Sequence, residues 1–156
     1  MADDKERKPH TIDYPGDTTG MAERPRDEMR DYRGRDLLAG RRALITGGDS
    51  GIGRAVAVAF AKEGADVAIA YLEEQEDAEH TAALVEAEGR ACHLYPGDLA
   101  DPAHCRTVVA EAAAAMGGLE IVVNNVGTQQ PVDDFAELDD EQWRRTFAVN
   151  IDSFFH

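Results

Sequence analysis

The sequence has few aromatic residues, few basic residues and only two cysteines, and it has no long hydrophobic run. Aromatic residues make up 6% of its 156 residues, and 16 basic residues stand against 31 acidic ones. A membrane-spanning helix needs about 20 consecutive apolar residues, and a signal peptide needs an apolar stretch near its start. The sequence contains no apolar run of this length, and its first ten residues are rich in charge, unlike those of a signal peptide. We therefore expect a cytoplasmic protein with no membrane partner.

The shortage of basic residues argues against one class of ligand. The formal net charge of -15 would repel a nucleic-acid backbone, and no stripe of lysine and arginine occurs that could overcome this repulsion. We therefore expect no nucleic-acid partner. The excess of acid is interpreted as a well-solvated surface.

The cysteines and histidines lack the spacing of metal ligands. Cys92 and Cys105 do not form a Cys-x-x-Cys motif, and they fall in an expected strand and an expected helix. They are interpreted as reduced packing residues. The five histidines show neither His-x-x-x-His nor Cys/His ligand spacing. The sequence predicts no metal site.

Residues 1–36 differ from the rest of the chain. They are highly charged, they contain Pro9, Pro15 and Pro25, and their few apolar residues follow no period. This composition predicts an extended arm or a disordered tail. The folded domain is then expected over residues 37–156.

From residue 41 onward, short apolar runs alternate with helical patterns. The expected strands are 42–46, 66–71, 91–96 and 119–125, and the expected helices are 51–64, 76–89, 101–118 and 139–155. Asp101 followed by Pro102 starts the third helix, and Asp139 with Gln142 resembles a capping box at the start of the fourth. This alternation predicts an α/β fold with a doubly wound parallel sheet covered by helices on both faces.

The stretch "LITGGDSGIG" (44–53) joins the first expected strand to the first expected helix through closely spaced glycines. A helix N-terminus carries unpaired N–H groups and a partial positive charge, and glycines let an anion approach the backbone. Gly47, Gly51 and Gly53 stand where such a site needs them. No Gly-Lys-Ser/Thr follows, so a nucleotide-triphosphatase loop is excluded.

The chain resembles the short-chain dehydrogenases/reductases over residues 40–156. Their motif Thr-Gly-x-x-x-Gly-x-Gly is matched by Thr46, Gly47, Gly51 and Gly53. Asp98-Leu99 resembles the family's motif after the third strand, and Asn124 to Gly127 resembles the family's Asn-Asn-Ala-Gly after the fourth. Val126 replaces the alanine of that motif. Asn150 resembles the asparagine of the family's catalytic tetrad.

This resemblance implies a Rossmann-type domain that binds NAD or NADP and an oxidoreductase that transfers hydride between the nicotinamide and a small alcohol or carbonyl substrate. Asn150 would hold a water in the proton relay. Asp98 would accept from the adenine amino group or stabilise a turn, and Asn125 would line the cofactor or form the strand end. The residues assigned to the cofactor are Thr46, Gly47, Asp49, Ser50, Gly51, Ile52, Gly53, Tyr71, Leu72, Asp98, Leu99, Asn125, Val126 and Gly127.

Local charge bears on the choice between the two cofactors. The second expected strand ends at Tyr71-Leu72, without the acid typical of NAD sites or a nearby arginine for NADP. No lysine or arginine occurs between Lys62 and Arg90, whereas Asp49 and the glutamates at 73 and 74 add negative charge. This charge would penalise the 2′-phosphate of NADP, and it favours NAD.

The resemblance covers only the amino-terminal part of the family's fold. The family's catalytic serine and Tyr-x-x-x-Lys pair follow the asparagine helix, and no Tyr-x-x-x-Lys occurs in this sequence. We therefore expect a truncated domain of about four strands that lacks the C-terminal strands and is inactive alone. Strand 119–125 would then be an exposed edge that makes the isolated chain marginally stable or prone to aggregate.

Three functional hypotheses remain open. The first is part of an oxidoreductase, in which the arm of residues 1–36 resembles N-terminally extended family members described as aldehyde reductases or sugar-alcohol dehydrogenases. The second is a noncatalytic dinucleotide-binding module, and the third is an inactive, unfolded remnant. Trp143, Phe147, Phe154 and Phe155 resemble the family's subunit-pairing helix, or they belong to the core. A full-length protein is expected to be a homo-oligomer.

Overall fold

Residues 25–156 are described by a computed structural model, and residues 1–24 of the expected arm lie outside the described residues. Its four-stranded sheet has the order β3-β2-β1-β4, and all three strand pairs are parallel. The strands are β1 (Arg42–Thr46), β2 (Asp66–Tyr71), β3 (Cys92–Pro96) and β4 (Ile121–Val123). This confirms the predicted parallel sheet of the Rossmann type, with four strands.

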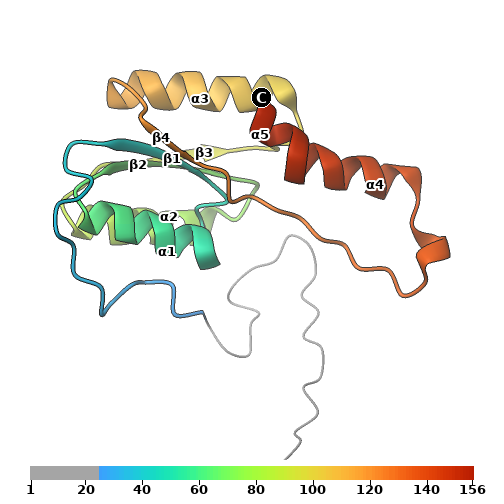
Figure 1. The fold of residues 1–156 in the computed structure, drawn as a ribbon, viewed down its shortest axis with the longest axis horizontal. Helices are drawn as coiled ribbons and strands as arrows, with labels where there is room; N and C mark the ends of the chain where they lie inside the picture. Colours follow the sequence, from blue (N-terminus) through green and yellow to red (C-terminus); the bar gives the residue numbers. More distant parts are fainter. Residues whose placement is uncertain (1–24) are drawn as a thin grey trace, which may run out of the picture.

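Helices cover both faces of the sheet (Figure 1). α1 and α2 pack on one face and α3 on the other, while α4 and its continuation lie beyond the carboxyl ends of the strands. The helices are α1 (Gly51–Lys62), α2 (Gln75–Ala87), α3 (Pro102–Met116), α4 (Asp140–Phe147) and α5 (Ser153–Phe155). A 3-10 turn, η2 (Phe135–Glu137), precedes α4, and a π-helical segment, η3 (Ala148–Asp152), joins α4 to α5.

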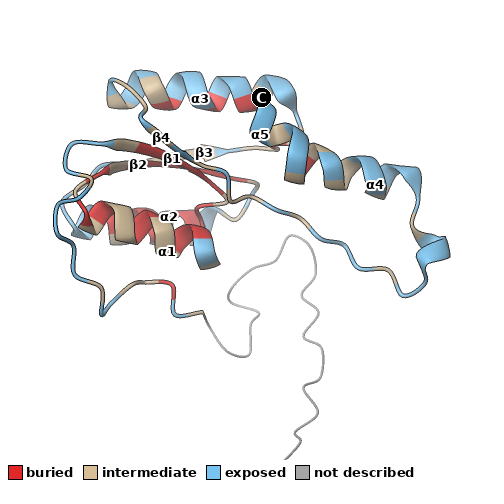
Figure 2. Cartoon of the chain, viewed as in Figure 1, coloured by how far each residue is buried: buried red, intermediate tan, exposed pale blue. Residues whose placement is uncertain are grey.

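The core has two parts because successive side chains of a strand point to opposite faces. On one face, Ile45, Val67 and Ile69 pack with apolar residues of α1 and α2. On the other, Leu44 and Ala68 pack with apolar residues of α3. Figure 2 shows the buried residues concentrated in the central strands and in the helix faces turned towards them. No helix within residues 25–156 is both long enough and apolar enough to cross a membrane.

Helix ends follow the sequence closely. The Asp101 side chain accepts a hydrogen bond from the backbone N–H of Ala103, Pro102 occupies the first turn of α3, and Gly117 ends it with a φ of 73°. At α4, Asp139 and Gln142 form a capping box. The predicted caps of both helices are confirmed.

The last two predicted elements differ from the structure. The predicted strand 119–125 is shortened to β4, and it lies at the edge of the sheet with Val122 half exposed. The predicted helix 139–155 is not one uniform α-helix, because η3 interrupts it. The aromatic residues of this region are largely exposed and do not belong to the core, Trp143 and Phe155 most clearly.

Candidate cofactor site

The glycine-rich turn connects the end of β1 to the start of α1. Gly47 and Gly51 have φ values of 63° and 53°, a backbone conformation that residues other than glycine rarely adopt. Gly53 lies so close to the preceding turn that a Cβ atom there would be 1.8 Å from the carbonyl oxygen of Gly47. Above Gly51, by contrast, an added Cβ would meet no atom within 4 Å. The turn is therefore closed beneath Gly53 and open at the N-terminus of α1.

Hydrogen bonds join this turn to the end of β4. Asn125 Nδ2 donates to the carbonyl oxygens of Thr46 and Gly47, at 3.0 and 2.9 Å. Thr46 Oγ1 accepts from the backbone N–H groups of Asn125 and Val126, both at 3.1 Å. These four bonds hold the carboxyl ends of β1 and β4 together. The strand order reverses between β1 and β4, and ligands of doubly wound sheets bind at such a switch point.

A cavity of about 330 Å³ lies at this place. Its size falls at the lower end of the range for small-molecule sites, about 300–1,000 Å³. Its lining residues come from the turn, from the ends of β2, β3 and β4, and from the segment of α4 and η3: Gly47, Asp49, Ser50, Gly51, Ile52, Gly53, Tyr71, Leu72, Glu74, Gly97, Asp98, Leu99, Asn125, Val126, Gly127, Thr128, Arg145 and Val149.

The structure brings nearly all of the residues assigned from the sequence to this one cavity. Thirteen of the fourteen line it, and Thr46 lies directly beneath as the acceptor described above. Val126 packs against the buried cluster on the α3 face, which accounts for its larger side chain. Five further lining residues were not assigned to the cofactor from the sequence: Glu74, Gly97, Thr128, Arg145 and Val149. Gly97 has a φ of 144° immediately before Asp98, but Arg145 lies 47 residues from Asp98 and nothing in the sequence pairs them.

Asp98 is held by two groups from different elements. Its carboxylate accepts from Arg145 Nη1 of α4 at 2.5 Å and from the backbone N–H of Ala100 at 2.9 Å. Partial burial works to raise the pKa of Asp98, but the hydrogen bonds from Arg145 and Ala100 outweigh it and the pKa is lowered. Asp98 therefore stays a carboxylate at neutral pH, able to accept a further hydrogen bond from a ligand.

Asp49 has the opposite environment. Its residue surface is 8% exposed. Burial raises the pKa of Asp49, and the neighbouring carboxylates of Glu74 and Asp77 add to this effect. Asp49 and Glu74 both line the cavity, so the wall near the end of β2 is acidic.

Asn150 lies beside the cavity, in the π-helical segment. Its Oδ1 accepts from the backbone N–H of Thr128 at 2.7 Å, and its Nδ2 donates to the Thr128 carbonyl at 2.9 Å. Single π-helical turns within α-helices occur often at functional sites. Here the turn presents Asn150 to the irregular segment that follows β4, and the pair of bonds fixes the amide beside Thr128, which does line the cavity. Among residues 25–156, no group of three or more histidine, cysteine or acidic side chains is arranged to hold a metal ion.

Comparison with known proteins shows the family to which the chain belongs. The family profile described as "short chain dehydrogenase" matches residues 41–156. The chain belongs to this family. The profile covers the sheet, the helices and every residue of the cavity. The family resemblance that was based on the glycine turn, Asp98, Asn125 and Asn150 is therefore confirmed.

Individual relatives agree with this assignment. The uncharacterized oxidoreductase YhdF of Bacillus subtilis is 48% identical over 147 residues, which are 94% of this chain and 51% of YhdF. The NADPH-dependent aldehyde reductase 1 of Arabidopsis thaliana is 37% identical over 161 residues, 99% of this chain and 55% of the relative. A crystal structure of a short-chain dehydrogenase from Burkholderia cenocepacia in complex with NADP has 41% identity and a TM-score of 0.73, and the match covers 76% of this chain and 48% of that one. The chain thus spans about half the length of these relatives.

Proposed function

We propose that the cavity binds a nicotinamide dinucleotide and that the whole protein is an oxidoreductase that transfers hydride between this cofactor and a small alcohol or carbonyl compound. The observation that carries the proposal is the glycine turn between β1 and α1, which is open at the helix N-terminus and lies at the switch point of the sheet. A dinucleotide pyrophosphate needs this combination of a helix N-terminus and absent side chains.

The lining residues suit the separate parts of such a cofactor. The first turn of α1 would receive the pyrophosphate on backbone N–H groups, which have no acceptors within the helix. Asp98, kept ionised by Arg145 and Ala100, would accept from the adenine amino group. Asn125 and Thr46 would support the floor of the site by fixing the turn to β4. The nicotinamide, once bound, supplies the hydride chemistry.

The kind of dinucleotide is the finer part of the proposal. The acidic wall formed by Asp49 and Glu74 opposes a 2′-phosphate by charge, which was the reason for favouring NAD. This preference has no support among the relatives, because the Burkholderia enzyme holds NADP and the Arabidopsis enzyme is NADPH-dependent. The proposal is therefore a nicotinamide dinucleotide of either kind.

The catalytic part of the proposal concerns the whole protein, since the chain matches only about half of the length of each of these relatives. Asn150 is proposed to take part in proton transfer, positioned by its two bonds to Thr128. No Tyr-x-x-x-Lys occurs in these 156 residues, and in the family this pair and the catalytic serine follow the asparagine helix. We accordingly expect these residues to bind the cofactor and to show no turnover without the remainder of the family's fold. An aldehyde or a sugar alcohol is the substrate class we propose, as for the aldehyde reductase relative.

The alternative is a noncatalytic dinucleotide-binding module, and two measurements separate the hypotheses. The purified chain is titrated with NADH and with NADPH while cofactor fluorescence and thermal unfolding are followed. Saturable binding with a raised Tm supports the cofactor site, because a ligand that binds only the folded state stabilises it. Absence of binding to either cofactor contradicts the proposal. Turnover of an aldehyde by the protein that contains the family's serine, tyrosine and lysine then distinguishes an enzyme from a binding module.

We also propose that the protein pairs with a second copy through α4. Trp143 and Phe147 stack there with ring centroids 4.7 Å apart, and both are exposed. Exposed apolar patches of this kind mark protein contacts. Light scattering is expected to give a dimer or larger, with Trp143→Gln shifting it towards the monomer. A wild-type monomer at high concentration would contradict the proposal.

A further inference from the structure

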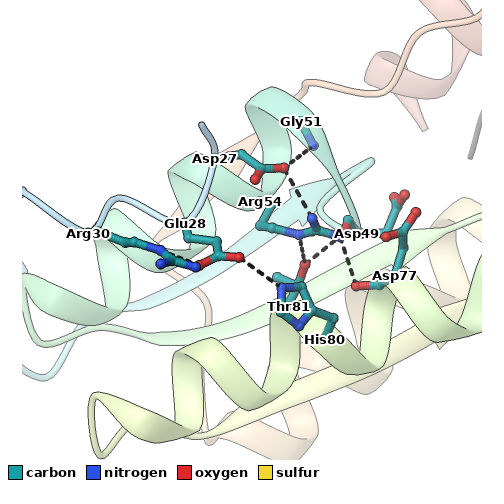
Figure 3. Close-up of polar contacts among 9 residues, drawn as sticks. All are labelled: Asp27, Glu28, Arg30, Asp49, Gly51, Arg54, Asp77, His80 and Thr81. Atoms are coloured by element: carbon teal, nitrogen blue, oxygen red, sulfur yellow. Dashed lines mark hydrogen bonds and ion pairs between the residues drawn. The ribbon is translucent and has the colours of Figure 1, made fainter. Parts of the chain in front are cut away.

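One acidic residue of the N-terminal arm reaches the glycine-rich turn. Asp27 is 5% exposed, and its Oδ2 accepts from the backbone N–H of Gly51 at 2.9 Å. The same oxygen forms an ion pair with Arg54 Nη1 at 3.2 Å. Figure 3 shows Asp27 placed over the start of α1, with Gly51 on one side and the Arg54 guanidinium on the other. The arm therefore contacts the cofactor turn directly.

Arg54 connects this contact to the inner side of the turn. Its Nε and Nη2 donate to the carbonyl oxygen of Asp49 at 3.1 and 2.7 Å. Thr81 Oγ1 of α2 donates to the same oxygen at 2.7 Å. Nη2 also pairs with Asp77 at 2.7 Å. The backbone of the turn is thus fixed at the Asp49 carbonyl by Arg54 and at the Gly51 N–H by Asp27.

Asp27 takes the position of a helix cap that the local sequence does not supply. Ser50 is the N-cap residue of α1, but its side chain makes no capping hydrogen bond. A carboxylate that accepts from a first-turn N–H satisfies an otherwise unpaired donor and favours the positive end of the helix. Asp27 does this from 24 residues before Gly51, and the neighbouring residues Ser50, Ile52 and Gly53 line the cavity.

The arm is also fixed at the other end of α1. Glu63, which follows the helix, accepts from the Tyr32 hydroxyl and from the backbone N–H groups of Arg35 and Leu37, the latter two at 2.9 Å. Lys62 Nζ donates to the carbonyl oxygen of Tyr32 at 3.2 Å. The described part of the arm therefore runs along α1 from its first residue to its last, so that both ends of the helix are attached to it.

We propose that Asp27 is a positioning residue of the cofactor site, which holds the glycine-rich turn in the shape that receives the pyrophosphate. Residues 25–36 are in this sense part of the site. The inference rests on the proposed function, because it assigns Asp27 a role in dinucleotide binding. It goes beyond that function, since the family profile begins at residue 41 and the arm lies outside it.

The charge of Asp27 is compatible with an anionic ligand nearby. A free carboxylate beside the turn would repel a pyrophosphate, but Asp27 is paired with Arg54, and both side chains are only 6% exposed. Arg54 offsets part of the charge of Asp27, although it also pairs with Asp77. Charge-assisted hydrogen bonds of this kind are stronger than neutral ones. Asp27 therefore fixes the backbone at the Gly51 N–H, next to Ile52 and Gly53, which line the cavity.

The experiment compares Asp27→Ala and Asp27→Asn with a matched control, Glu28→Ala. Glu28 lies on the same segment, and its carboxylate pairs with Arg30 and His80 instead of with the turn. The dissociation constants of ADP-ribose, which carries the pyrophosphate, and of adenosine, which does not, are measured for each variant by calorimetry. Hydrogen exchange of the Gly51 amide and the Tm are followed in parallel.

For Asp27→Ala, we expect ADP-ribose to bind about tenfold more weakly, while adenosine binds as before. A tenfold change in affinity corresponds to a free energy within the usual range for the loss of an N-cap. Asp27→Asn should lie between Asp27→Ala and wild type, because its amide oxygen still accepts from Gly51 but no longer forms an ion pair with Arg54. Glu28→Ala should match wild type. Should Asp27→Ala fail to fold, the same comparison is made with Asp27→Asn.

Unchanged ADP-ribose affinity in the folded Asp27 variants would overturn the inference. Equal weakening of both ligands would overturn it too, because a loss of overall structure does not select the pyrophosphate. A wild-type protein that binds neither ligand would instead refute the proposed function. In that case amide exchange decides the inference: faster exchange at Gly51 in Asp27→Ala supports the hold on the turn, and unchanged exchange contradicts it.

Discussion

Gly53 is the position at which the cofactor turn tolerates a side chain least. An added Cβ would lie 1.8 Å from the carbonyl oxygen of Gly47 and 2.8 Å from Asn125 Nδ2. The first of these atoms is backbone, and it is fixed by its own bond to Asn125. Overpacking a well-packed site costs about 1–3 kcal/mol, and a backbone obstacle places Gly53→Ala at the upper end, about 3 kcal/mol.

This loss of stability can be measured by chemical unfolding, and it corresponds to a fall in Tm of roughly 10 °C for a chain of this size. Gly89→Ala is the control, since Gly89 has a φ of 75° and an added Cβ there meets nothing within 4 Å. The control should lose only the cost of the left-handed backbone, about 1–2 kcal/mol, and keep cofactor affinity. A Gly53→Ala protein that is as stable as wild type and binds NADH or NADPH equally well would refute this reasoning.

Further predictions concern three other places in the molecule. Asn125→Ala removes two hydrogen bonds to backbone carbonyls, and it should lower the free energy of unfolding, measured by urea denaturation, by about 2 kcal/mol. An unchanged urea midpoint would contradict the conclusion that these bonds hold the ends of β1 and β4 together. Burial raises the pKa of Asp49, so the stability that its protonated form gives at low pH is lost as the pH rises through that pKa. Asp49→Asn should therefore raise the Tm at pH 7 and reduce the dependence of the Tm on pH. A lower Tm of this variant at pH 7 would show that the charge of Asp49 is compensated in the folded protein. Burial raises the pKa of Cys92 to about 12 and that of Cys105 in the same direction, so neither thiol should react with a disulfide reagent at pH 8 until the protein is unfolded.

The sheet and most of the cavity could be predicted because their signals are local. A strand buried on both faces is a continuous apolar run, as in 42–46 and 66–71. A glycine with positive φ stands one or two residues after the end of each of the helices α1, α2 and α3. The glycine turn, Asp98 and Asn125 all follow the carboxyl ends of strands, and those ends converge in a doubly wound sheet. Strand order then brings them together.

The contacts of the arm could not be predicted because they depend on a fold that forms elsewhere. Asp27 is one of many acidic residues in a segment without periodicity, and its partner Arg54 stands in an alanine-rich helix. The structure buries Arg54 on the same helical face as Ala57, Val58 and Ala61. Burial of an arginine on that face is possible only because Asp27, Asp77 and the Asp49 carbonyl surround it.

The end of the chain differs for a similar reason. Helix propensity favours a continuous helix over 139–155, but the two bonds between Asn150 and Thr128 are made from a π-helical turn. Such a turn shifts the register of the side chains that follow, and no local pattern in the sequence encodes it. Arg145 also finds its partner, Asp98, across the cavity.

Amide chemical shifts test the central claim most directly. ¹⁵N-labelled protein is titrated with NADPH and, separately, with NADH, and the shift of each backbone amide is followed to saturation. The account predicts saturable changes with at least one cofactor, concentrated in residues 47–53, 97–99 and 125–128, all of which except Gly48 line the cavity. Absence of saturable change with both cofactors, or changes confined to residues outside this cavity, would contradict it.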